Sequence, residues 1–89
     1  MKTLSNNQDL YEYLLFLDSL LKQRGAMALS EIVQFASMQA STFPVTEFLG
    51  ESRIALRRVL DEENGILNKQ ERTDLHDVLK QLNSAFNKR

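Results

Sequence analysis

The sequence has 89 residues, of which 11 are basic and 12 acidic, giving a formal net charge of −1. This length fits one domain, so residues 1–89 are predicted to form a single helical domain. The balanced charge disfavours a dedicated nucleic-acid binder, and the absence of cysteine excludes disulfides and thiolate metal sites.

Membrane insertion and secretion are also disfavoured by the sequence. The longest apolar run covers residues 14–17, far short of the ~20 residues that a membrane-spanning helix needs. No apolar signal-peptide region follows the amino terminus. We therefore expect a cytoplasmic protein without a membrane segment.

The pattern of apolar residues predicts an all-α fold, a small bundle of about four amphipathic helices joined by short loops. Only one Pro and three Gly interrupt the chain, which favours helices over a sheet with many turns. Apolar positions recur every three or four residues, the spacing of one helix face.

The first helix is predicted from Gln8 to Arg24, with Asn6 or Asn7 as its N-cap and Gly25 just past its end. Four leucines form the face that we expect to meet the core, namely Leu10, Leu14, Leu17 and Leu21. Further apolar residues lie on both flanks of that face and comprise Tyr11, Tyr13, Leu15, Phe16 and Leu20. One stripe cannot hide so much apolar surface. We interpret the flanking residues as a homodimer interface, and burial of both flanks within one chain is the alternative.

The second helix is predicted from Met27 to Ala40 and the third from Thr46, as N-cap, to Glu63. Pro44 separates the two helices. The expected apolar face of the second helix contains Ala28, Leu29, Ile32, Val33, Phe35, Ala36 and Ala40.

The pair Asn64–Gly65 is predicted to end the third helix. Asn68, with Glu71 three residues later, resembles a capping box that starts the fourth helix. From the middles of the apolar faces, we expect a core that includes Leu14, Leu17, Ile32, Leu56, Val59, Leu79 and Leu82.

The only basic cluster in the sequence is Arg53, Arg57 and Arg58, on the third helix. With the second helix and Pro44 before it, this helix suggests a helix-turn-helix nucleic-acid binder as an alternative function. Acidic residues follow Arg57 and Arg58 at i+4, at Asp61 and Glu62, and would pair with them on the same helix. The sequence pattern therefore disfavours nucleic acid as a partner.

No catalytic, cofactor or metal motif is recognised in the sequence. The single histidine, His76, is expected on the polar flank of the fourth helix without an orienting carboxylate. Residues 60–71 resemble the spacing of an EF-hand calcium loop, but the first ligand position is Leu60, which carries no oxygen ligand. We therefore expect no enzyme activity, no cofactor and no metal site.

By elimination, the sequence favours a small non-catalytic interaction or regulatory module. Its expected partner is another protein or a second copy of the chain, through the apolar excess of the first helix. Closed twofold homodimers are the commonest oligomers, so self-association is the default form of this prediction.

Overall fold

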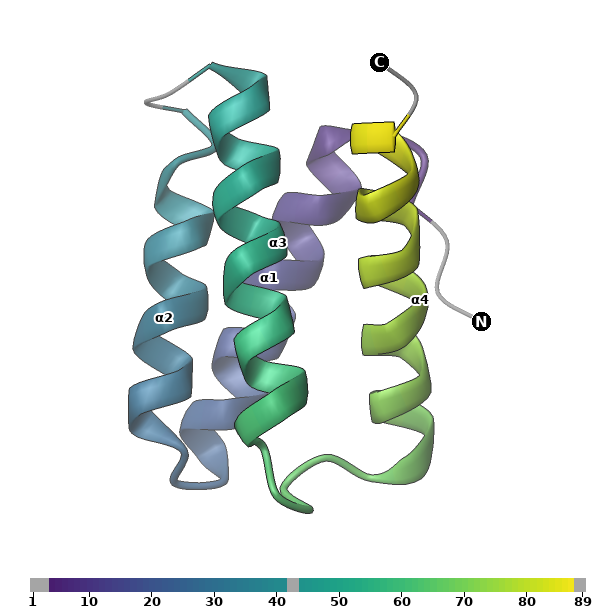
Figure 1. The fold of residues 1–89 in the computed structure, drawn as a ribbon. Coiled ribbons are helices and arrows are strands. Elements are labelled where there is room, and N and C mark those ends of the chain that lie inside the picture. Colours follow the sequence, from purple (N-terminus) through teal and green to yellow (C-terminus); the bar gives the residue numbers. More distant parts are fainter. Residues whose placement is uncertain (1–3, 42–43, 88–89) are drawn as a thin grey trace.

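The computed structural model describes residues 4–41 and 44–87. It contains α1 (Asn7–Gln23), α2 (Met27–Met38), α3 (Val45–Glu62) and α4 (Lys69–Asn87). In Figure 1, α2, α3 and α4 stand side by side, and α1 crosses obliquely behind them. Over the described ranges the chain forms no strand, and the predicted all-α bundle is confirmed. None of the helices described there has both the length and the apolar character needed to cross a membrane.

Both ends of α1 follow the predicted capping chemistry. The Asn6 side chain accepts a hydrogen bond from the Asp9 backbone N–H at 2.9 Å, so Asn6 is the N-cap. Beyond the helix, Gly25 adopts a φ of 81°, which suits a residue without Cβ. The Ala26 N–H then donates to the Leu21 carbonyl at 2.9 Å, closing a Schellman turn that directs the chain into α2.

The start of α3 differs from the prediction. The helix begins at Val45, and Pro44 is the N-cap, so Thr46 lies inside the first turn. The Pro44 carbonyl accepts hydrogen bonds from the N–H groups of Glu47 and Phe48 at 3.0 and 3.1 Å. The extended ψ of 154° at Pro44 marks the change into helix, and the proline ring fixes a φ that suits this position.

A buried glutamate shapes the turn between α3 and α4. Asn64 and Gly65 both have positive φ, 49° and 87°, and end α3 as predicted. The Glu63 side chain folds under this turn, where its Oε1 accepts hydrogen bonds from the N–H groups of Gly65 and Leu67 at 2.9 and 3.0 Å. Arg72 approaches the second carboxylate oxygen of Glu63 at 3.5 Å. The buried charge is therefore compensated by two donors and one cation.

The predicted capping box at the start of α4 is confirmed. Asn68 accepts a hydrogen bond from the Glu71 N–H, and Glu71 accepts one from the Asn68 N–H, each at 2.8 Å. Arg24 adds a forked ion pair to the Glu71 carboxylate at 2.6 and 2.9 Å and donates to the Ile66 carbonyl. These contacts tie the end of α1 to the beginning of α4.

The core lies where α1 crosses the other three helices. The buried apolar side chains described are Leu10, Tyr13, Leu14, Leu17, Leu21, Leu29, Val33, Ala36, Phe48, Ala55, Leu56, Val59, Leu67, Leu75, Val78, Leu79 and Leu82. All predicted core residues are among them except Ile32, which is only partly buried and packs at the core edge.

Candidate docking face around α2

The second helix is unusual in its low charge. It carries one charged residue, Glu31, among its 12 residues. Its buried side contains small residues and two serines, Ser30 and Ser37, beside Leu29, Val33 and Ala36. Its outer side exposes three large apolar side chains, which are Met27, Phe35 and Met38. Helices at a protein surface normally present polar residues outward, so the outer side of α2 is a candidate binding surface.

The orientation of α2 follows from a polar contact with α1. The Ser30 hydroxyl donates a hydrogen bond to the carboxylate of Asp18, and both residues are buried. A buried carboxylate requires a donor, so α2 must turn its serine side toward α1. As a result Phe35, which the sequence pattern places on the buried face, is 57% exposed. That prediction is wrong because the buried face of α2 includes serines.

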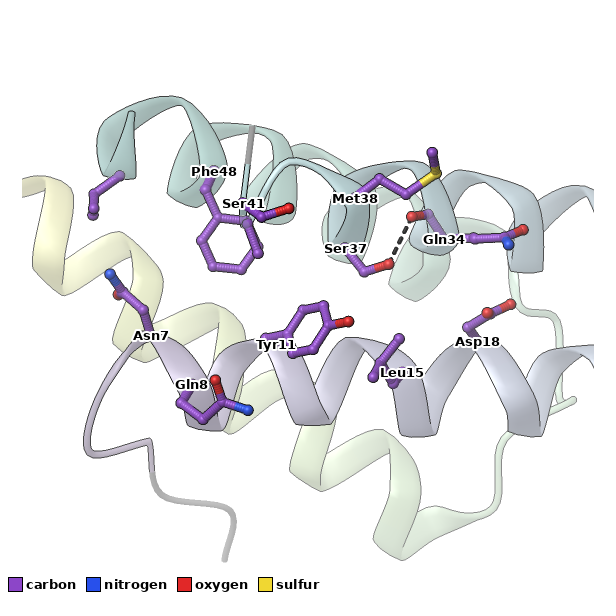
Figure 2. A pocket seen from close by; sticks show the side chains of 12 residues that line it. Asn7, Gln8, Tyr11, Leu15, Asp18, Gln34, Ser37, Met38, Ser41 and Phe48 are labelled. Carbon is purple, nitrogen blue, oxygen red and sulfur yellow. Dashed lines mark hydrogen bonds between the residues drawn. The ribbon is translucent and has the colours of Figure 1, made fainter. Parts of the chain in front are cut away.

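An open groove of about 740 Å³ lies between α1, the end of α2 and the beginning of α3. Its apolar lining includes Tyr11, Leu15, Met38, Val45 and Phe48, and its polar lining includes Asn7, Gln8, Gln34 and Ser41. Figure 2 shows the Tyr11 ring lying along the groove below Ser37 and Phe48, with Leu15 beside it and Met38 on the opposite wall. The Ser37 hydroxyl already donates its hydrogen bond to the Gln34 carbonyl at 2.7 Å, so it is not available as a donor to a ligand.

A second, smaller groove of about 300 Å³ lies on the other side of α2, against α3. Phe35 and Ile54 line it from the two helices, and Ile32, Glu31 and Arg58 are also in its lining. Phe35 and Ile54 are exposed by 57% and 62%. The apolar surface of α2 therefore extends onto both neighbouring helices.

Exposed large apolar side chains gather around α2. Of the seven in the described residues, six lie on α2 or line one of its two grooves. We call these six the α2 face: Leu15, Met27, Phe35, Met38, Val45 and Ile54. The seventh is Phe16, which lies elsewhere on α1. Exposed apolar patches mark contact sites on small proteins.

The five residues predicted as an interface on the first helix do not share one surface. Leu15 and Tyr11 line the groove toward α2. Tyr13 is buried in the chain's own core, and the Phe16 ring lies 6.4 Å from the Tyr13 ring, centre to centre. Leu20 is partly buried against the core. Only Leu15 and Phe16 of the five are exposed, and they lie on opposite flanks of α1.

The environment of Tyr13 fits a core residue. Burial, followed by the negative charges of Asp74 and Glu71 on α4, raises the pKa of the phenol above its ordinary value. The hydroxyl therefore stays protonated through the physiological range. Tyr13 packs toward α4, and the adjacent Phe16 lies on that same side of α1.

The arginines of α3 have acidic neighbours. Arg57 pairs with Asp61 at 3.5 Å and Arg58 with Glu62 at 2.8 Å, both within the helix. Arg53 lines a groove of about 420 Å³ between α3 and α4, together with Leu79 and Asn83. The sequence pattern correctly indicated the two ion pairs.

His76 and the segment that resembles a calcium-binding loop do not form a metal site together. His76 is exposed on α4. In the segment that resembles an EF-hand loop, the Glu63 carboxylate accepts hydrogen bonds from backbone N–H groups. The Glu71 carboxylate binds Arg24. Among residues 4–41 and 44–87, no three His, Cys, Asp or Glu side chains gather as a metal ion would require.

The sequence pattern missed Met27, Phe35, Met38 and Ile54 as surface residues of interest. One signal was available, because Met38 and Ile54 fall outside the apolar face of their own helices. Apolar residues off the buried face are expected to be exposed. In comparisons with known proteins, no family model, curated protein or solved structure matches this chain.

Proposed function

We propose that this chain is a non-catalytic protein–protein interaction module that binds its partner through the α2 face. The observation that carries the proposal is the gathering of six of the seven exposed large apolar side chains around α2. We also place its action in the cytoplasm, in keeping with a chain that contains no cysteine.

The chemistry of the α2 face suits a protein partner. Protein interfaces are enriched in aromatic residues and methionine and depleted of charge at their centre. The outer side of α2 supplies Phe35, Met27 and Met38 beside a single carboxylate, Glu31. Methionine side chains adapt their shape to a partner. A partner with an apolar helical ridge would fit the grooves on either side of α2.

A nucleic-acid partner at α3 is the weaker candidate. Phosphate recognition depends on cations that can neutralise the backbone. The acidic partners of Arg57 and Arg58 are held on the same helix, and Glu47 and Glu51 occupy its first half. Glu47 and Glu51 would repel phosphates at the amino-terminal end of α3, which is the end that a recognition helix presents to the bases.

A paired-variant capture experiment tests the proposal. The chain offers a matched pair, since Phe35 and Phe16 are 57% and 56% exposed on different faces. Parent, Phe35→Glu and Phe16→Glu proteins are immobilised and exposed to lysate of the source cells, and the bound proteins are quantified by mass spectrometry. Circular dichroism first verifies that both variants keep the parent helix content.

If the α2 face is the binding surface, we expect the parent and Phe16→Glu to capture the same specific set of proteins. This set includes any additional copies of the chain. This set is lost from Phe35→Glu. Equal capture by Phe35→Glu and the parent would contradict the α2 face as the binding surface. Loss from Phe16→Glu alone would move the interface to the α4 side of α1.

A further inference from the structure

The outer side of α3 has the shape of a ridge between two grooves. Ile54 stands at its middle and is 62% exposed. The groove toward α2 and the groove toward α4 both include Ile54 and Arg58 in their lining. Helices pack by placing the ridges of one into the grooves of the other. The ridge and its grooves are therefore ready to receive another helix of similar shape.

Charged residues flank Ile54 on both sides along this ridge. Glu51 lies one turn before Ile54, and Arg57 and Arg58 lie one turn after it, all three exposed. The partly buried Arg53 directly precedes Ile54, and the exposed Asp61 and Glu62 lie nearer the end of the helix. When a second α3 is laid antiparallel across Ile54, Glu51 of each helix meets Arg57 of the other, because each lies three positions from Ile54. A parallel arrangement would bring like charges together, which is unfavourable.

The ion pairs already present on α3 do not prevent this match. The side chains of Arg58 and Glu62 are 57% and 51% exposed, and exposed pairs of this kind contribute little to stability. Arg58 donates to Glu62 from Nε, whereas a guanidinium carries five N–H donors in all. One arginine can therefore hold Glu62 and also meet a carboxylate of a second chain.

The acidic residues at the far end of α3 have little influence on this contact. In an antiparallel pair, Asp61 of one copy would lie nearest Glu47 of the other, because each is seven positions from Ile54. Packed helices cross at an angle and diverge away from the crossing point. The contacts within about one turn of Ile54, which involve Glu51, Arg57 and Arg58, therefore determine the orientation.

We propose that the partner seated on α3 is a second copy of this chain, in a twofold dimer whose antiparallel α3 helices cross at Ile54. The inference rests on the proposed function, because Ile54 belongs to the α2 face. It assigns the self-association predicted from sequence to α3 rather than to the first helix. The charges nearest Ile54 favour a second copy as the partner, since Glu51 and Arg57 of one chain each meet the oppositely charged residue of the other.

Charge reversal within the homodimer provides the first test. Parent, Glu51→Arg, Arg58→Glu and the double variant are compared by analytical ultracentrifugation at low and high salt. Each single variant places like charges across the interface, and symmetry makes every contact occur twice. We expect dimer dissociation constants about tenfold or more above the parent for the single variants, and recovery to within about threefold for the double variant. Salt should weaken the parent dimer.

Two control variants carry the same charge changes on other surfaces. Lys80→Glu on α4 matches Arg58→Glu, and Glu12→Arg on α1 matches Glu51→Arg, at residues that are exposed and outside both α3 grooves. Neither control should alter the dissociation constant by more than about twofold. Circular dichroism verifies folding of all variants, as expected for exposed sites.

A single-cysteine variant provides the second test, because the chain contains no cysteine of its own. Helix axes ~8–10 Å apart, with each Cα ~2.3 Å from its axis, bring residues at the crossing point within disulfide reach. Ile54→Cys should therefore form a disulfide-linked dimer under mild oxidation. Phe16→Cys, at a site exposed to a similar degree, should remain largely uncrosslinked.

The outcomes separate this inference from the proposed function. A parent protein that is strictly monomeric at tens of micromolar overturns the self-pairing, whereas loss of captured partners from Phe35→Glu would still support the α2 face. A dimer unaffected by either charge reversal, or one crosslinked through residue 16 but not 54, also overturns the antiparallel α3 contact.

Discussion

The Ser30 hydroxyl donates a hydrogen bond to the Asp18 carboxylate across the contact between α1 and α2, where both residues are buried. Ser30→Ala would leave the carboxylate without this donor. An unsatisfied buried polar group costs about 1–3 kcal/mol, with more for a charged one. We expect a decrease of that size in the free energy of unfolding, measured with urea. A decrease below about 0.5 kcal/mol would contradict the role given to this contact.

The hydroxyl of Ser52 supplies the matched comparison. Ser52 is fully buried, and its Oγ has no hydrogen-bond partner in the described part of the chain. Ser52→Ala removes a buried polar group that already lacks compensation, so the free energy of unfolding should stay within about 0.5 kcal/mol of the parent or increase. A loss above about 1 kcal/mol in the same urea titration would indicate a partner for this hydroxyl.

The link between Arg24 and Glu71 predicts a pH dependence. Hydrogen bonds from the Arg24 guanidinium and the Asn68 backbone N–H hold the pKa of Glu71 below its ordinary value. Because the pKa is lower in the folded state, the ionised carboxylate stabilises the fold above its unfolded pKa of about 4.5. This contribution disappears as the pH falls through the folded pKa.

Glu71→Gln should therefore be less stable than the parent at pH 7, with a smaller difference between the two at about pH 3. Urea unfolding at several pH values measures this dependence. Glu62→Gln is the control, because Glu62 also pairs with an arginine but its side chain is 51% exposed. A difference between Glu71→Gln and the parent that is independent of pH would contradict the assignment.

The packing of α3 can be tested at two nearby apolar residues, one on its buried side and one on its exposed side. Leu56 is fully buried, and Leu56→Ala should reduce the free energy of unfolding by about 2–5 kcal/mol. Ile54→Ala, on the exposed ridge, should change it by less than about 0.5 kcal/mol, provided that the monomer is measured. Similar losses at both positions would show that Ile54 is buried and that α3 turns a different side toward the core.

Local sequence signals predict most of this fold. The caps at Asn6, Gly25 and Asn68–Glu71 involve residues only a few positions apart, so their chemistry can be recognised without knowing the tertiary arrangement. The α3 start was less predictable, because at Pro44 a backbone carbonyl rather than a side chain begins the helix.

The orientation of the helices depends on contacts between distant residues, and this limited the prediction of the candidate site. The rotation of α2 about its axis, which exposes Phe35, depends on the hydrogen bond from Ser30 to Asp18, 12 residues earlier. The burial of Tyr13 depends on the packing of α1 with α4, whose charges act on its phenol. Spacing along one helix shows which residues share a face, but it does not identify the neighbouring helix.

Site-specific photocrosslinking in the source cells detects whether the α2 face docks a partner. A photoreactive phenylalanine analogue is placed at Phe35 or, in the control, at Phe16, which is equally exposed on the other face. We expect discrete higher-mass adducts of the chain from position 35 and few from position 16. Adducts from position 16, with none from position 35, would contradict docking through the α2 face.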